Sequence, residues 1–243
     1  MSSFVASSPV AIPCQGILFD MDGILVSSLG SVERSWTRWA ELRGVDPEQT
    51  VKVAHGCRAI DTIARMRPDL DPETELKVIE DIEVADNEGL TVLPGVLDLI
   101  QALPRDRWTV VTSATERLAR VRMAAGGVPV PNRLVTADKV TQGKPHPEPF
   151  LAGAALLGFR PGECVVFEDS ASGARAGRAA GCTVVATTFS HPVESLDAAD
   201  YLIADVTCVT VERSQDGLVL RLIPIAGSSS TPMLQSGAHA GPA

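Results

Sequence analysis

The segment Gly16-Ile17-Leu18-Phe19-Asp20-Met21-Asp22-Gly23 decides how this chain is expected to fold. Its apolar run predicts a buried strand, which ends abruptly at Asp20 and Asp22. Because open α/β sheets bind their ligands at the carboxyl ends of the strands, we expect these two carboxylates at a binding site. The glycine after them lets the main chain approach a ligand closely. Taken alone, the pattern also fits a solvated turn with two surface aspartates.

Apolar, β-branched runs of the same kind recur along the chain. They predict strands at 16–20, 108–112, 133–136, 163–167, 182–186 and 201–203. Segments with helical spacing lie between most of them, at 115–125, 148–157 and 171–180. Strands that alternate with helices predict an α/β fold with a parallel sheet covered on both faces. Near the end of the chain, Asp216-Gly217 between runs at 209–212 and 218–223 predicts a hairpin, which we expect to extend an edge of this sheet.

The interval between the first two predicted strands, 21–107, is far longer than the dozen or so residues that a crossover needs. Its pattern is mostly helical, with amphipathic segments at 32–42, 57–66 and 72–87. We therefore predict a helical cap domain at 28–91, with hinges near 26–28 and 89–94. The catalytic core would comprise 14–27 and 92–226, and 1–13 and 227–243 are expected to be flexible tails.

Composition excludes several classes of function. The formal net charge of the 243-residue chain is −9 and no basic stripe is present, which argues against a nucleic-acid partner. No apolar stretch approaches the ~20 residues that span a bilayer, and residues 1–13 do not resemble a signal peptide, so a cytoplasmic enzyme without a membrane partner is expected. The five cysteines are odd in number and form no C-x-x-C pair, which argues against disulfides or a zinc site.

The two aspartates after the first strand suit transfer of a phosphoryl group. Asp20 can act as a nucleophile because a carboxylate needs no deprotonation at neutral pH. Its repulsion from a phosphate has to be overcome by a bridging cation. Asp22 could give a proton to the leaving oxygen and then take one from water.

Three further segments carry matching groups. Thr112, Ser113 and Ala114 end the second strand, where hydroxyl and N–H groups are natural phosphate ligands, although Ser113 or Thr115 could instead cap the next helix. Lys144 lies between a glycine and a proline, in a loop where a fixed ammonium can screen charge, although on its own it would pass for one of many exposed lysines. The third segment, Glu168 and Asp169, follows an apolar run, and carboxylates of this kind are ligands that Mg²⁺ prefers.

Taken together and in this order, the segments resemble the four motifs of the haloacid dehalogenase-like superfamily of aspartate-nucleophile phosphotransferases. Asp20-Met21-Asp22-Gly23 matches the first motif, Ser113 the second, Lys144 the third and Glu168-Asp169 the fourth. The resemblance covers about residues 16–203 and implies a Rossmann-like core. The predicted helical insert is similar to the cap of the subfamily that contains β-phosphoglucomutase and many sugar phosphatases.

The resemblance implies a role for each motif residue. Asp20 would be the nucleophile and Asp22 the general acid and base, while Ser113 and Lys144 hold the phosphoryl oxygens. Mg²⁺ would be bound by the Asp20 carboxylate, the main-chain carbonyl of Asp22, and Asp169. Glu168 would lie behind these groups or serve as an occasional ligand.

The cap carries a more specific resemblance. His55-Gly56-Cys57-Arg58-Ala59-Ile60-Asp61-Thr62 is similar to a segment of yeast-type glycerol-phosphate and deoxyglucose-phosphate phosphatases and their bacterial relatives. It implies a Mg²⁺-dependent phosphatase that hydrolyses a small sugar or polyol phosphate through a phosphoaspartate, and that acts as a monomer. His55, Arg58 and Glu33 are the expected cap contacts to substrate, with Arg58 the leading one because its planar fork binds two oxygens at once. Cys57 stands where that group usually has arginine, so the resemblance does not identify the substrate.

Two other functions fit the same motifs. A sugar phosphomutase of the β-phosphoglucomutase type shares the whole catalytic set and differs in protecting the phosphoaspartate from water. A catalytically silent phosphosugar-binding protein on the same fold is the second alternative. A hydrolytic dehalogenase would not need Asp22, and a phosphonate hydrolase would need a cap lysine in a context that Lys52 and Lys77 lack.

Overall fold

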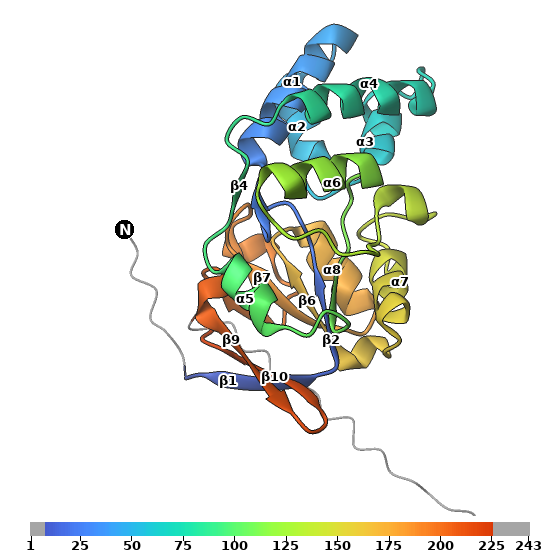
Figure 1. The fold of residues 1–243 in the computed structure, drawn as a ribbon. Coiled ribbons are helices and arrows are strands. Elements are labelled where there is room, and N and C mark those ends of the chain that lie inside the picture. Colours follow the sequence, from blue (N-terminus) through green and yellow to red (C-terminus); the bar gives the residue numbers. More distant parts are fainter. Residues whose placement is uncertain (1–7, 226–243) are drawn as a thin grey trace, which may run out of the picture.

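A five-stranded parallel sheet forms the centre of the computed structural model, which describes residues 8–225 (Figure 1). The strand order is β5-β2-β6-β7-β8, and all four pairings are parallel. The strands are β2 Gly16–Phe19, β5 Trp108–Val110, β6 Cys164–Glu168, β7 Thr183–Thr187 and β8 Tyr201–Ile203. The predicted α/β fold is therefore confirmed. The strand expected at 133–136 is wrong, because only Val135 bridges to the sheet, at Val111.

Helices cover both faces of the sheet, as the alternating side chains of β2 require. Leu18 packs on one face with Phe150 and Ala154 of α7, whereas Ile17 and Phe19 belong to the cluster on the other face. The helices of the core are α5 Val96–Ala102, α6 Glu116–Ala125, α7 Glu148–Leu157 and α8 Ala171–Ala179. The 3₁₀ turns are η1 Ala137–Lys139, η2 Pro161–Glu163, η3 Val193–Ser195 and η4 Val206–Cys208. Among the described residues, no helix has the length and apolar character needed to cross a membrane.

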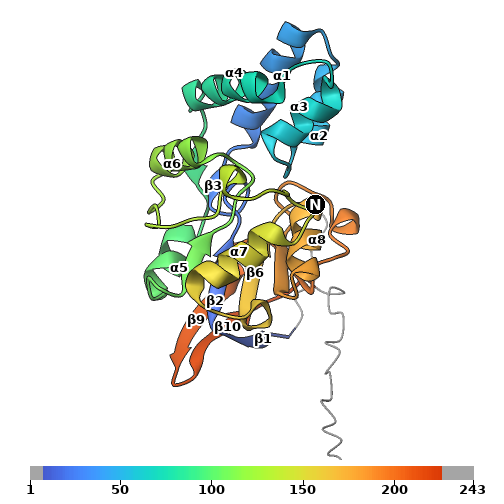
Figure 2. The same cartoon turned by 90° about the vertical axis from the view of Figure 1, so that its right-hand side faces the viewer.

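The predicted hairpin forms, but it does not extend the parallel sheet. β9 Val209–Ser214 and β10 Gly217–Leu222 build a separate antiparallel sheet with β1 Val10–Cys14, in the order β1-β10-β9. It lies at the end of the core opposite the cap (Figures 1 and 2). The reason is that β10 pairs with β1, while its alternate leucines, Leu218, Leu220 and Leu222, pack into the same hydrophobic cluster as Ile17 and Phe19. The expectation of a flexible tail is consequently wrong for residues 10–13, and the tail expected at 227–243 lies outside the described residues.

Four helices form the cap above the core (Figure 2). They are α1 Leu29–Arg43, α2 Pro47–Ala54, α3 Ala59–Met66 and α4 Pro72–Ala85. They enclose a hydrophobic cluster of their own, in which Trp39 and Ile79 are fully buried. The two linkers to the core, β3 Val26–Ser27 and β4 Thr91–Val92, pair with each other as antiparallel strands. They coincide with the predicted hinges, although the exact domain boundaries stay a prediction.

Candidate active site

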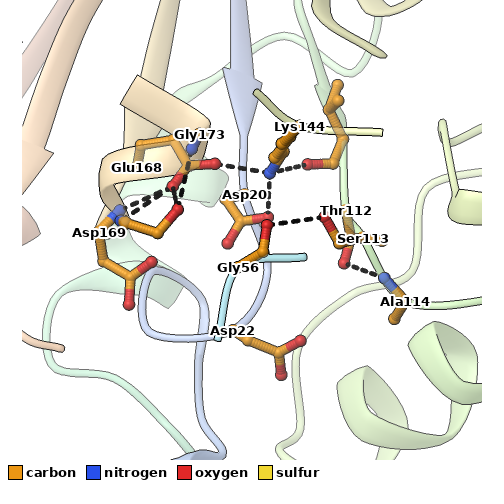
Figure 3. A network of polar contacts seen from close by, with 12 residues as sticks. Asp20, Asp22, Gly56, Thr112, Ser113, Ala114, Lys144, Glu168, Asp169 and Gly173 are labelled. Carbon is orange, nitrogen blue, oxygen red and sulfur yellow. Dashed lines mark hydrogen bonds and ion pairs between the residues drawn. The ribbon is translucent and has the colours of Figure 1, made fainter. Parts of the chain in front are cut away.

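The carboxyl ends of three neighbouring strands bring the four motif segments together (Figure 3). Asp20 follows β2, and its main-chain N–H still bonds to Phe167 of β6. Thr112 and Ser113 follow β5, and Asp169 follows β6. Segments far apart in sequence meet because parallel strands end at one edge of a sheet.

Lys144 is the centre of the polar network. Its Nζ atom donates to Asp20 Oδ1 at 2.7 Å, to Glu168 Oε1 at 2.6 Å and to the Val111 carbonyl at 3.1 Å. It also lies 5.0 Å from the ring centre of Phe150. Burial alone lowers the pKa of Lys144, but the charges of Asp20 and Glu168 outweigh burial and hold this pKa above its ordinary value. The lysine is therefore a fixed buried cation and not one of the exposed lysines of the surface.

Three buried carboxylates share this single cation. The side chains of Asp20, Glu168 and Asp169 offer oxygens that all lie within 4.8 Å of one another. Burial raises the pKa of Asp20 to about 7 even though Lys144 opposes the shift. Burial, followed by the charges of Glu168 and Asp20, also raises the pKa of Asp169 well above its ordinary value. When all three carboxylates are ionised they exceed Lys144 by two negative charges, which one divalent cation with a preference for oxygen would balance.

The main chain around this cluster is shaped to fit it. Gly23 has φ 78°, and a Cβ atom there would lie 1.8 Å from Asp169 Oδ2, so only glycine allows Asp169 to reach the cluster. Glu168 Oε2 accepts from the N–H groups of Asp169 and Ser170 and from Ser170 Oγ. These bonds fix the fully buried Glu168 between Lys144 and the start of α8, where Ser170 is the N-cap.

The predicted phosphate-binding segment lies directly under the cap. Ser113 Oγ donates to the carbonyl of Gly56 in the cap at 3.2 Å, and Ser172 Oγ donates to the same carbonyl at 3.0 Å. The N–H of Ala114 donates to Thr112 Oγ1 at 3.1 Å. Thr115, and not Ser113, caps α6, which leaves the Ser113 hydroxyl outside the helix. The cap is thus closed over the strand ends.

A cavity of about 80 Å³ lies between cap and core. It is lined by core residues of the motifs and by residues of the cap, among them Asp20, Asp22, Thr112, Ser113, Asp169, Trp36, His55 and Leu76. His55 thus lies at the cavity, where burial lowers its pKa and where its ring centre is 6.4 Å from that of His191. His191 lines the cavity too and was not among the predicted residues, because no local pattern in the sequence marks it. Lys144 and Glu168 lie beneath the cavity floor and do not line it.

The expectation that Arg58 is the leading substrate contact is not supported by its position. Its guanidinium makes two bonds to the Asp61 carboxylate and a third, at 3.0 Å, to the Val140 carbonyl in the core. The side chain packs against Gly143 and does not line the cavity. Arg58 therefore joins cap to core. Glu33 is exposed and does not line the cavity either.

Asp22 lines the cavity but its carboxylate is not part of the cluster around Lys144. Its Oδ2 atom accepts from Arg122 Nη1 of α6 at 3.0 Å. Arg122 Nη2 in turn donates to Glu83 Oε1 of the cap helix α4, also at 3.0 Å. The sequence predicts a helix around Arg122 but contains no signal that the side chain reaches Asp22. The expected contribution of Asp22 to metal binding is its main-chain carbonyl, which stays a prediction.

Comparison with known proteins agrees with this geometry. The profile of the haloacid dehalogenase-like hydrolases matches residues 14–181. The chain belongs to this family. Hexitol phosphatase A of Escherichia coli (strain K12) is 39% identical over 212 residues, which cover 85% of this chain and 98% of that protein. Glycerol-1-phosphate phosphohydrolase 2 of Saccharomyces cerevisiae is 35% identical over 199 residues, which cover 76% of this chain and 80% of that protein.

Solved structures share the fold of this chain. CbbY from Rhodobacter sphaeroides in complex with phosphate superposes with a TM-score of 0.70 at 25% identity, covering 79% of this chain and 94% of that one. β-Phosphoglucomutase from Clostridium difficile superposes with a TM-score of 0.68 at 19% identity, covering 79% and 91%. The second similarity concerns the fold alone. This chain is thus a hydrolase of the family with the helical cap in place.

Proposed function

We propose that this enzyme hydrolyses the phosphate monoester of a small polyol or sugar through a phosphoaspartate at Asp20, with hexitol phosphates as the first candidates. The observation that carries the proposal is the buried pair of Asp20 and Lys144 beneath a closed cavity that Asp22 also lines. The substrate class is supported by the similarity to hexitol and glycerol-1-phosphate phosphatases over most of the chain.

Each group has a defined task in this reaction. An Asp20 oxygen forms a bond to phosphorus while the bond from phosphorus to the leaving oxygen breaks, and Asp22 gives that oxygen a proton. Water then attacks phosphorus, Asp22 accepts the proton of that water, and the bond from phosphorus to the Asp20 oxygen breaks, which releases inorganic phosphate and restores the Asp20 carboxylate. Lys144 keeps Asp20 oriented through its 2.7 Å bond, and the hydroxyl of Ser113 would bind a phosphoryl oxygen.

The carboxylates of Asp20 and Asp169 are suited to hold Mg²⁺, with Glu168 beside them. The ion would supply positive charge that offsets the repulsion between Asp20 and the phosphoryl oxygens. The family membership and the excess of buried negative charge both support this assignment.

The closed cap supports a small substrate. The cavity between cap and core favours a small substrate over a protein or nucleic-acid chain, and closure of the cap would exclude bulk water during the transfer step. The residues named above come from one chain, so we infer that a monomer is active, which size-exclusion chromatography of the active protein would check.

Phosphate release from a panel of small esters tests the proposal. The purified protein is incubated with sorbitol 6-phosphate, glycerol 1-phosphate and 2-deoxyglucose 6-phosphate, with Mg²⁺ or with EDTA, and Asp20→Asn is the matched control. We expect Mg²⁺-dependent release from at least one of them and none from Asp20→Asn. Isomerisation of a sugar phosphate without release would favour the mutase. Binding of the esters without any turnover would favour the silent binding protein.

A further inference from the structure

Asp22 is held in place by a buried arginine that no motif includes. Arg122 lies in the last turn of α6 and is only 3% exposed. Its Nη1 atom donates to Asp22 Oδ2 at 3.0 Å, although the two residues are 100 positions apart. The other oxygen, Asp22 Oδ1, is itself buried and has no hydrogen-bond partner within the described residues. The arginine thus fixes one of the two oxygens, and the other stays free of any hydrogen bond within the described residues.

The same arginine is bound from the cap. Arg122 Nη2 donates to Glu83 Oε1 of α4 at 3.0 Å, and the Glu83 side chain is 6% exposed. A guanidinium is planar and always charged, so its two ends can orient two carboxylates at once, which a lysine ammonium does less rigidly. Glu83 reaches Arg122 because the cap helix α4 lies against the core helix α6.

We propose that Arg122 is the positioning residue for Asp22, and that Glu83 makes this positioning depend on closure of the cap. This inference rests on the proposed function of Asp22 as the group that protonates the leaving oxygen. Arg122 acts through Asp22, since its two terminal nitrogens are both occupied by carboxylates. With the cap open, Arg122 loses one of its two partners, and Asp22 loses a fixed orientation.

Proton donation matters most for a poor leaving group, and this dependence gives the test. The kcat/KM value reports the steps up to loss of the alcohol, so it measures donation by Asp22 and not the later attack of water. Phenol is a poorer leaving group than 4-nitrophenol, and the rings of the two phosphate esters carry no hydroxyl group that a sugar-binding residue would contact. The ratio of kcat/KM for 4-nitrophenyl phosphate over phenyl phosphate therefore rises when donation is impaired.

The experiment compares this ratio in the wild type, Asp22→Asn, Arg122→Met and Glu83→Gln. Since general acid catalysis contributes typically 10²–10⁴-fold, we expect Arg122→Met to raise the ratio about tenfold or more, in the same direction as Asp22→Asn. Glu83→Gln should raise the ratio less than Arg122→Met does. Arg122→Lys should give a ratio between those of Arg122→Met and the wild type. The matched control is Asp81→Asn, which removes another ion pair between α4 and α6, with Arg117, and should leave the ratio unchanged.

Arg122→Met leaves Glu83 buried without its cation, so the double variant Arg122→Met/Glu83→Met is measured beside it. Circular dichroism establishes that each variant is folded. The inference is overturned if the folded double variant keeps the wild-type ratio. It is also overturned if Asp81→Asn raises the ratio as much as Arg122→Met does. Either outcome leaves the proposed function intact. A wild type that releases phosphate from no ester overturns both.

Discussion

Replacing Asp20 by asparagine should stabilise the metal-free protein, and the gain should grow with pH. Burial raises the pKa of Asp20 from its ordinary value of 3.8 to about 7. Between these values the folded protein holds a proton that the unfolded chain has released, so the stability of the folded state falls as pH rises. The whole loss is about 4 kcal/mol, because each unit of pKa corresponds to about 1.4 kcal/mol. The asparagine of the variant would carry no such cost, although its amide would still occupy the place beside Lys144.

Thermal unfolding of the parent and of Asp20→Asn in EDTA measures this effect. About 3 kcal/mol of this loss of stability occurs above about pH 5. For a chain of this length, that energy corresponds to a change of roughly 6–12 °C in the difference between the Tm values of variant and parent. Comparing the variant with the parent at each pH cancels the titration of all other groups. Adding Mg²⁺ should narrow the difference, because a bound cation stabilises the parent more than the variant.

Two outcomes would refute this reasoning. A Tm difference that is the same at about pH 5 and about pH 8 would mean that Asp20 is ionised throughout. A variant that is less stable than the parent at the higher pH in EDTA would mean that the ion pair with Lys144 outweighs the cost of burial. A double-mutant cycle with Lys144→Met and Asp20→Asn/Lys144→Met separates the two contributions, since it isolates the coupling between the two side chains.

The same contacts lead to three further predictions. Lys144→Met should lower kcat by about 10²–10³-fold, the range found when one preorganised donor is removed, and an unchanged kcat in a folded variant would contradict the role of Lys144. Arg58→Ala should lower kcat/KM for a sugar phosphate and for 4-nitrophenyl phosphate by the same factor, because Arg58 joins cap to core outside the cavity; a loss confined to the sugar phosphate would restore its assignment as a substrate contact. Burial raises the pKa of the thiols of Cys14, Cys164 and Cys182 to about 12, about 11 and about 12, so at about pH 8 they should resist iodoacetamide in the folded protein, and rapid labelling of all three, read by mass spectrometry, would show otherwise.

Much of the catalytic centre was predictable because each of its parts is local in the sequence. An apolar run followed at once by a carboxylate is one strand and its end, and no distant residue is needed to recognise it. The parallel sheet then brings those ends together, which is why Asp20, Glu168 and Asp169 meet, and Lys144 reaches them from the loop before α7. The helical insert was equally visible, because its amphipathic periodicity continues well beyond what a crossover needs.

The short and the distant elements were not predictable in this way. The helix α5, with 7 residues, is too brief for periodicity to mark it clearly. β1 is a strand because it pairs with β10, about two hundred residues away along the chain, and its own sequence includes Pro13. The run at 133–136 is apolar because it is covered by the core, and it makes only one bridge because the chain leaves the sheet edge there.

Residues that are neighbours along the chain thus specify the sheet, the cap and the chemical groups at the strand ends. The packing of the two domains determines instead which side chains line the cavity and which join cap to core. Arg58 carries the most suggestive cap motif yet faces Val140, whereas Arg122 and Glu83 carry no motif and reach Asp22. Closure of one domain on the other sets the direction of these side chains, and the local sequence does not contain that direction.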